Sequence, residues 1–180
     1  MPPNVSDILY FEINNIGREK IRMDVSANID TSETYCQEIL MKCTKTLGPL
    51  ADDETLATLC EALLHFMLTA SVLPSERKVR FKEANLDVVI PSVKILQKNQ
   101  EKALIIQIIK NNDDTHKIIQ AESVQLLKEN IWIVSSKRLQ TNYRNYHLSE
   151  GQIPFYRIVR DIHAFVASKR LGGLKMLHGE

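Results

Sequence analysis

The chain has 180 residues, of which 44% are hydrophobic and 25% are charged, and its formal net charge is +1. This is the composition of an ordinary globular protein that is long enough for one domain with a buried core. The small net charge excludes a global electrostatic attraction to nucleic acid, so such a contact would need a local basic patch.

The cysteines and the apolar segments indicate the compartment. Cys36, Cys43 and Cys60 lie in the first third of the chain, and no signal-peptide pattern precedes them. An odd number of cysteines in this setting favours reduced thiols that fill space in the core. The longest apolar stretch, Leu63–Leu73, is short and contains polar residues, which argues against a membrane span. We therefore expect a soluble cytoplasmic protein, and the Ile and Lys usage suits a microbial, archaeal source.

Residues 1–28 predict a β-hairpin. Apolar and polar residues alternate in residues 8–14 and again in residues 21–25, and Asn14, Asn15 and Gly17 lie between the two segments. Period-two alternation around Asn and Gly is typical of a hairpin. A helix from Ser6 is the alternative, and the asparagines and the glycine disfavour it.

Two amphipathic helices follow. Acidic and hydroxyl residues open each one at Asp30 and Asp52, and Gly48-Pro49 and Pro74 end them. Apolar residues recur every three or four positions, which predicts a helical hairpin with one face against a sheet. His65 lies on the second helix, where a structural role is favoured because no acid or nucleophile is paired with it locally.

The middle of the chain predicts the sheet. Leu86–Ile90 and Ala103–Ile109 are apolar runs rich in β-branched residues, and the second predicts a strand buried on both faces. Asn111–Asp114 is a turn and capping cluster before a helix, and Ile131–Val134 is a further strand. This strand, helix and strand predict a βαβ unit with parallel strands.

The last part combines a polar, aromatic loop with a helix. The loop covers residues 137–151, and the amphipathic helix Phe155–Arg170 ends before Gly172-Gly173. The predicted organisation is therefore one domain over residues 1–180. It has an N-terminal hairpin (1–28), an α/β core (29–136), and a basic, aromatic loop with a C-terminal helix (137–180).

A resemblance to a known family rests on residues 54–136. Their predicted order is helix, three strands, helix and strand, with Asp87 at the head of the second strand and Lys110 at the end of the third. This arrangement resembles the core of the PD-(D/E)XK nuclease superfamily, the fold of restriction endonucleases and archaeal Holliday junction resolvases. The resemblance implies an α/β fold with a central mixed sheet flanked by helices.

The resemblance also implies a site. Asp87 matches the metal-binding Asp of the family, and Lys110 matches the lysine that orients or activates the attacking water. The family's second acid would stand at position 108, which is Ile108, and Gln107 is the nearest polar side chain. Glu83 is the second candidate ligand for Mg²⁺, and Glu54 or Glu61 is a candidate helix acid. The implied catalytic residues are Asp87, Gln107 and Lys110, and the implied metal ligands are Asp87 and Glu83.

One carboxylate and one amide make a weak magnesium site, because phosphodiester cleavage relies on Mg²⁺ held by carboxylates. The predicted activity is therefore that of a degenerate or atypical nuclease, metal-dependent if active. The alternative for Asp87 is a solvated strand-end acid or a turn acceptor. The alternative for Lys110 is a strand terminator that reaches water.

Basic and aromatic residues after the core predict nucleic-acid contacts, since Lys and Arg neutralise phosphates and Tyr stacks on bases. The predicted contact residues are Lys137, Arg138, Tyr143, Arg144 and Arg157. A solvated loop and helix face remains the alternative. The function expected is a nuclease-like domain associated with nucleic acid, without a membrane partner. The second hypothesis is a non-enzymatic α/β protein-interaction module, a possible homodimer through the helical hairpin or the last helix.

Overall fold

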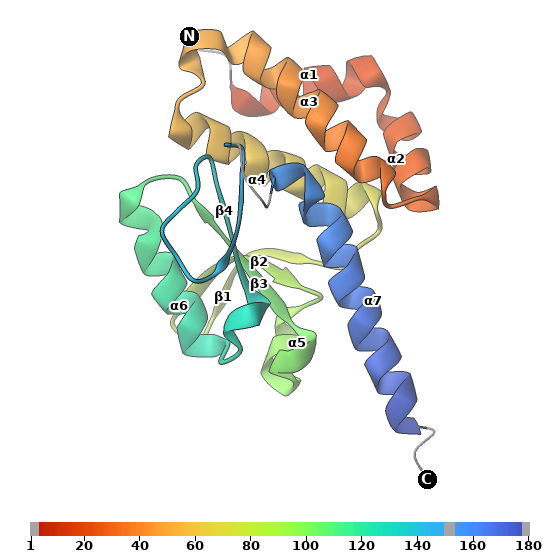
Figure 1. Cartoon of the computed structure of the whole chain (residues 1–180), viewed down its shortest axis with the longest axis vertical. Helices are drawn as coiled ribbons and strands as arrows, with labels where there is room; N and C mark the ends of the chain where they lie inside the picture. Colours follow the sequence, from red (N-terminus) through yellow and green to blue (C-terminus); the bar gives the residue numbers. More distant parts are fainter. Residues whose placement is uncertain (1–3, 150–153, 178–180) are drawn as a thin grey trace.

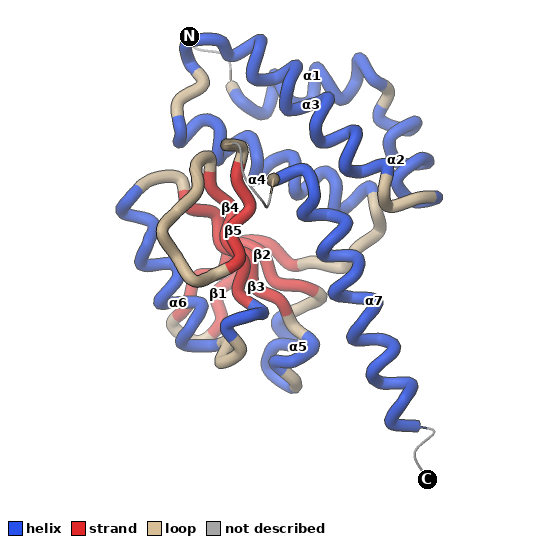
Figure 2. The backbone as a smooth tube through the Cα atoms, in the orientation of Figure 1, coloured by secondary structure: helices blue, strands red, loops and turns tan. Residues whose placement is uncertain are grey.

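The computed structural model describes residues 4–149 and 154–177, with the side chains of the last helix described up to residue 170. A five-stranded mixed sheet with the order β1-β2-β3-β4-β5 forms its centre (Figure 2). The first two strand pairs are antiparallel and the last two are parallel. The strands are β1 (Glu76–Phe81), β2 (Ala84–Ile90), β3 (Leu104–Ile109), β4 (Ile131–Ser135) and β5 (Arg144–His147).

Helices cover both faces of the sheet (Figure 1). The α-helices are α1 (Val5–Ile16), α2 (Arg18–Ala27), α3 (Thr31–Leu47), α4 (Asp53–Ala70), α5 (Val93–Lys98), α6 (His116–Val124) and α7 (Ile158–Leu177). Helix α4 lies on one face against β3 and β4, with α1 to α3 outside it, and α6 lies against β2 and β3 on the other face. This arrangement confirms the predicted α/β class with a mixed, helix-flanked sheet.

Strand β3 is the centre of the core. All six of its residues are buried. Leu104, Ile106 and Ile108 belong to the apolar cluster on the α4 side, and Ile105 belongs to the cluster on the α6 side. The prediction of a strand buried on both faces is therefore confirmed. The three cysteines are buried and free, as expected for space-filling thiols.

The prediction of an N-terminal β-hairpin is wrong, because residues 5–27 form the helices α1 and α2. Leu9 and Ile13, four positions apart, satisfy a helical spacing as well as an alternating one, and with Ile8 they are buried in the main core. The side chain of Asn4 caps α1 by accepting a hydrogen bond from the amide of Ser6. Gly17, with φ of 110°, lets the chain turn between the helices.

The C-terminal part differs from the prediction in two ways. Strand β5 lies within the segment that was expected to be a loop, and it pairs in parallel with β4. Helix α7 continues past Gly172 and Gly173 to Leu177. Most of the predicted break at residues 151–154 lies outside the described residues. None of the described helices is long and apolar enough to cross a membrane.

Candidate functional site

Strands β2 and β3 separate at the point where the predicted site begins. Their paired positions end at Val88 and Ile106, and beyond these residues side chains take the place of ladder bonds. Asp87 Oδ2 accepts a hydrogen bond from the Ile108 amide at 2.8 Å, and Gln107 Oε1 accepts one from the Asp87 amide at 2.8 Å. The structure therefore brings Asp87 and Gln107 together in the gap between the two strands.

Helix α6 closes this gap with Lys117. Its Nζ lies 3.2 Å from Asp87 Oδ2 and donates to the Ile108 carbonyl at 3.0 Å. Asp114 flanks the same ammonium, with Oδ1 at 3.7 Å. Gln107 Nε2 donates to the carbonyls of Asn85 and Lys117, so both ends of its amide are used. The sequence analysis did not select Lys117 and Asp114. Their opposite charges three positions apart, just after a predicted strand, could have indicated an ion pair there.

Lys110 makes a separate ion pair with helix α4. Its Nζ lies 2.7 Å from Glu61 Oε2, and both side chains are mostly shielded from water. The other oxygen of Glu61 lies 3.6 Å from Lys78 Nζ. Burial acts to raise the pKa of Glu61, but the hydrogen bond and the charge of Lys110 outweigh it, so the pKa lies below its ordinary value. Glu61, one of the two candidate helix acids, is thus the acid that meets Lys110.

The residues in this region do not fit a magnesium ion. Asp87 already contacts the ammonium of Lys117 and a backbone amide. Glu83 lies in the β1–β2 turn, where it pairs with Arg80 at 3.1 Å, and it stands four positions before Asp87, about 13 Å along an extended strand. Among residues 4–149 and 154–177, no three His, Cys, Asp or Glu side chains gather as metal ligands. The catalytic and metal roles assigned to Asp87, Gln107, Lys110 and Glu83 stay predictions.

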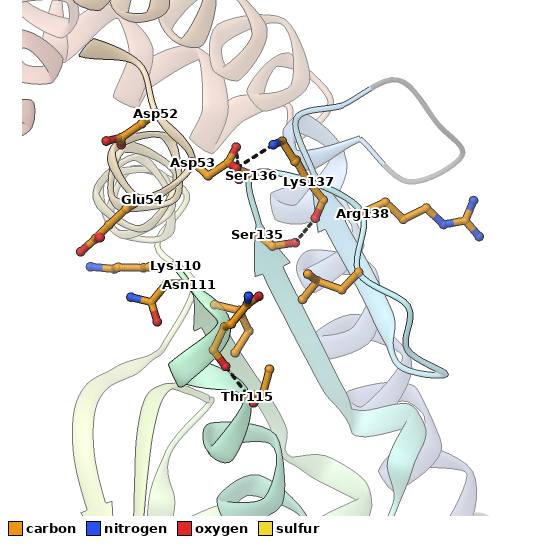
Figure 3. A pocket seen from close by; sticks show the side chains of 13 residues that line it. Asp52, Asp53, Glu54, Lys110, Asn111, Thr115, Ser135, Ser136, Lys137 and Arg138 are labelled. Carbon is orange, nitrogen blue, oxygen red and sulfur yellow. Dashed lines mark hydrogen bonds and ion pairs between the residues drawn. The ribbon is translucent and has the colours of Figure 1, made fainter.

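A cleft of about 540 Å³ opens at the carboxyl ends of β3 and β4, beside the first turn of α4 (Figure 3). It contains three acidic and three basic side chains together with hydroxyl and amide groups. Its lining is Asp52, Asp53, Glu54, Ile109, Lys110, Asn111, Asn112, Thr115, Ser135, Ser136, Lys137, Arg138 and Leu139. Lys137 Nζ lies 2.7 Å from Asp53 Oδ2, and Ser136 Oγ donates to Asp53 Oδ1 at 3.1 Å. We call this feature the strand-end cleft.

The five predicted nucleic-acid contacts do not lie in one place. Lys137 and Arg138 line the strand-end cleft, whereas the other three do not. Arg144 pairs with Asp161 at 2.7 Å and lies over the ring of Trp132 at 4.8 Å. Tyr143 donates a hydrogen bond to Glu122. The Nε atom of Arg157 is buried and has no hydrogen-bond partner among the described residues.

Comparison with solved structures identifies the fold. No family model matches the sequence, and no curated protein matches it. The chain is similar to metal-depleted Ecl18kI in complex with uncleaved DNA, with a TM-score of 0.50 and 7% identity over 92% of this chain and 80% of that chain. A complex of metal-depleted Ecl18kI with uncleaved, modified DNA has a TM-score of 0.49, with the same identity and coverage. Ecl18kI is a PD-(D/E)XK restriction endonuclease, so the fold implied by the sequence resemblance is confirmed.

Proposed function

We propose that this chain is a nuclease-like domain that associates with nucleic acid and whose catalytic centre is degenerate. The observation that carries the proposal is the strand-end cleft, whose lining combines Lys110, Lys137 and Arg138 with hydroxyl and amide donors and with three acidic side chains. Cationic and hydroxyl side chains are the groups that contact phosphates in nucleic-acid complexes. The shared fold with Ecl18kI, which is bound to uncleaved DNA in the matching structure, supports this choice of ligand.

The cleft needs a small rearrangement to accept a phosphate, because its acidic and basic side chains balance. The pair between Lys137 and Asp53 is the easiest to open, since the two side chains are 71% and 48% exposed. Exposed ion pairs contribute only about 0–1 kcal/mol, so exchange of the Asp53 carboxylate for a phosphate costs little. Arg138 makes no ion pair with the residues that the structure describes, and it is available without any exchange.

The degenerate centre follows from the groups around Asp87 and Lys110. The Oδ2 atom of Asp87 already contacts Lys117 and a backbone amide, and both polar atoms of the Gln107 amide are engaged. Ile108, which stands where the family places an acid, is buried among apolar residues on the α4 side. These contacts favour binding over cleavage.

The proposal is tested by fluorescence anisotropy with labelled single-stranded, duplex and branched DNA and with RNA, over a series of salt concentrations. We expect binding that weakens as salt rises, because each phosphate contact releases counterions. The double variant Lys137→Gln/Arg138→Gln should weaken binding and flatten the salt dependence, whereas Lys128→Gln, an exposed lysine outside the cleft, should not. No binding by the wild type would overturn the proposal.

Cleavage is recorded in the same samples with Mg²⁺ or Mn²⁺. We expect intact nucleic acid from the wild type. Metal-dependent cutting that is lost in both Asp87→Ala and Lys110→Ala would instead establish an active nuclease and would contradict the degenerate centre.

A second candidate function is a protein-interaction module that forms a homodimer. It is favoured by apolar side chains on the outer helices, since Phe11, Met23 and Met41 are 62%, 70% and 67% exposed on α1, α2 and α3. Light scattering after size-exclusion chromatography would give twice the chain mass for such a dimer. The double variant Phe11→Ser/Met23→Ser should then elute as a monomer, and a wild-type monomer would exclude this candidate.

A further inference from the structure

Helix α4 carries a row of polar residues across the sheet. Asp53, Glu61, His65 and Thr69 are separated by multiples of four residues, so they follow a row that winds gradually around the helix. The two acids in the row each contact lysines of the sheet region: Asp53 pairs with Lys137, and Glu61 pairs with Lys110 and Lys78. His65, one turn further on, has no acidic partner among the described residues.

Two cavities lie beside His65. A cavity of about 150 Å³ is lined by Tyr10, Arg18, Arg22, His65, Phe66, Thr69 and Ala70. A wider, open depression of about 690 Å³ shares His65 and Thr69 with this cavity and adds Arg77 from β1. The side chains of His65 and Thr69 line both hollows. We call the two hollows together the His65 pocket: Tyr10, Arg18 and Arg22 line the smaller one, and Arg77 lines the open depression.

The charge of the His65 pocket is positive. Three guanidinium groups line it, and within the described residues neither Arg18 nor Arg77 forms an ion pair. Arg22 has only an exposed contact with Glu19 at 3.3 Å, and Arg18 lies 5.3 Å from the centre of the Tyr10 ring. The nearest acid on α4 is Glu61, whose oxygens are engaged by Lys110 and Lys78. Among the described residues the guanidinium groups of Arg18 and Arg77 therefore have no hydrogen-bonded carboxylate, although the charge of Arg77 reaches Glu61.

The imidazole of His65 is affected by this positive charge. Burial, together with the charge of Arg77, holds the pKa of His65 below its ordinary value. Its Nδ1 atom is shielded from water and has no hydrogen-bond partner among the described residues. A buried polar atom without a partner costs about 1–3 kcal/mol, so a ligand that accepts a hydrogen bond from the imidazole would offset this cost.

We infer that the His65 pocket binds a phosphate group, carried either by a nucleic-acid backbone or by a small phosphorylated molecule. Guanidinium groups bind phosphate oxygens through two parallel hydrogen bonds, and the hydroxyl of Tyr10 is a further donor. The smaller cavity has the volume of about five water molecules, which suits one phosphate group, while the open depression leaves room for what the phosphate is attached to.

This inference does not rest on the proposed function, because the His65 pocket and the strand-end cleft are different places. Twelve residues of α4 separate Asp53 from His65, which corresponds to about 18 Å along the helix axis. Binding at one can therefore be lost without the other.

The test is an NMR titration of the imidazole resonances in the wild-type protein. The probes are inorganic phosphate, adenosine monophosphate and a single-stranded oligonucleotide, each added separately. We expect a saturable shift of the His65 resonances, with the exposed residues His116 and His163 as internal references that do not follow it. Equal shifts of all three histidines, or no saturable shift with any probe, would overturn the inference without requiring a variant.

Variants then assign the contacts and the source of the phosphate. Arg18→Gln/Arg77→Gln should weaken the affinity by on the order of tenfold or more, whereas Lys128→Gln should leave it unchanged. A His65 shift with the oligonucleotide that persists in Lys137→Gln/Arg138→Gln would identify backbone phosphate. A shift with the two small probes alone would identify a small phosphorylated ligand. Unchanged affinity in the double arginine variant would contradict the pocket.

Discussion

At the scale of single residues, the Asp87 carboxylate is held by the protein itself. Lys117 and the Ile108 amide both contact its Oδ2 atom, and the side chains of Asp87 and Lys117 are only 17% and 20% exposed. A carboxylate that is paired in this way closes the gap between β2 and β3 instead of leaving it open to a ligand. The pair therefore has a structural role that can be measured.

Replacement of Lys117 by Met should destabilise the protein because it leaves Asp87 shielded and without its counter-charge. We expect a loss of about 2 kcal/mol in the free energy of unfolding, less than for a fully buried pair because water reaches both groups. Urea denaturation measures the loss. The double variant Asp87→Asn/Lys117→Met should recover part of it, and strictly additive losses would show that the two groups do not interact.

At the scale of elements, the pair between Glu61 and Lys110 fastens α4 to the end of β3. Strands β1 and β2 and helix α5 lie between α4 and β3 in the sequence, yet the two side chains meet at 2.7 Å. Because the pKa of Glu61 is lower in the folded protein than its ordinary value of 4.5, its ionised form is favoured by folding. The contact is therefore present above that value and is lost as the pH falls through the lower, folded-state pKa.

The variant Glu61→Gln should accordingly be less stable than the wild type at neutral pH, by on the order of 1–2 kcal/mol. The difference should shrink as the pH drops below 4.5, where the unfolded chain already binds the proton. Urea unfolding of both proteins across an acidic pH series checks this. A difference that does not depend on pH would assign the effect to packing of the side chain and not to its charge.

At the scale of the whole molecule, the sequence was informative where length and residue type agreed. The apolar run of β3 is short and rich in β-branched residues, which favours a strand over a helix, and it was predicted correctly. Leu9 and Ile13, four positions apart, fit both a strand and a helix, and the burial that selects the helix is a tertiary effect. Strand β5 was missed because its buried residues include Asn145 and His147, whose polarity suggests a loop.

In the candidate site, too, some residues could be identified from the sequence and others only from the fold. Asp87, Gln107 and Lys110 could be selected because they stand at strand ends, which sequence reveals. Glu61 was one of two candidate helix acids, and only the fold decides between them, since Glu61 reaches Lys110 from α4. Lys117 was not selected, because it reaches Asp87 from α6 on the other face of the sheet, a contact that only the folded arrangement specifies. The missing acid at Ile108 was visible in the sequence, whereas the satisfied hydrogen bonds around Asp87 were not.

The four N-terminal helices and the sheet share one apolar cluster, so they should unfold together. Leu9 on α1 is fully buried in the cluster that also contains Trp132 on β4, while its neighbour Phe11 is 62% exposed. We expect Leu9→Ala to cost roughly 3 kcal/mol and Phe11→Ala to stay within about 0.5 kcal/mol. Trp132, the single tryptophan, reports on the sheet by fluorescence, and far-ultraviolet circular dichroism reports mainly on the helices.

In Leu9→Ala both signals should shift to lower urea by the same amount, because a change in one cooperative unit lowers the stability of all of it. Phe11→Ala is the matched control, since it removes a large side chain from the same helix without opening a cavity. If the dichroism transition of Leu9→Ala moved while the Trp132 transition stayed in place, the N-terminal helices would be a separate unit attached to the sheet. Coincident transitions would instead establish that the N-terminal helices and the sheet unfold as one cooperative unit.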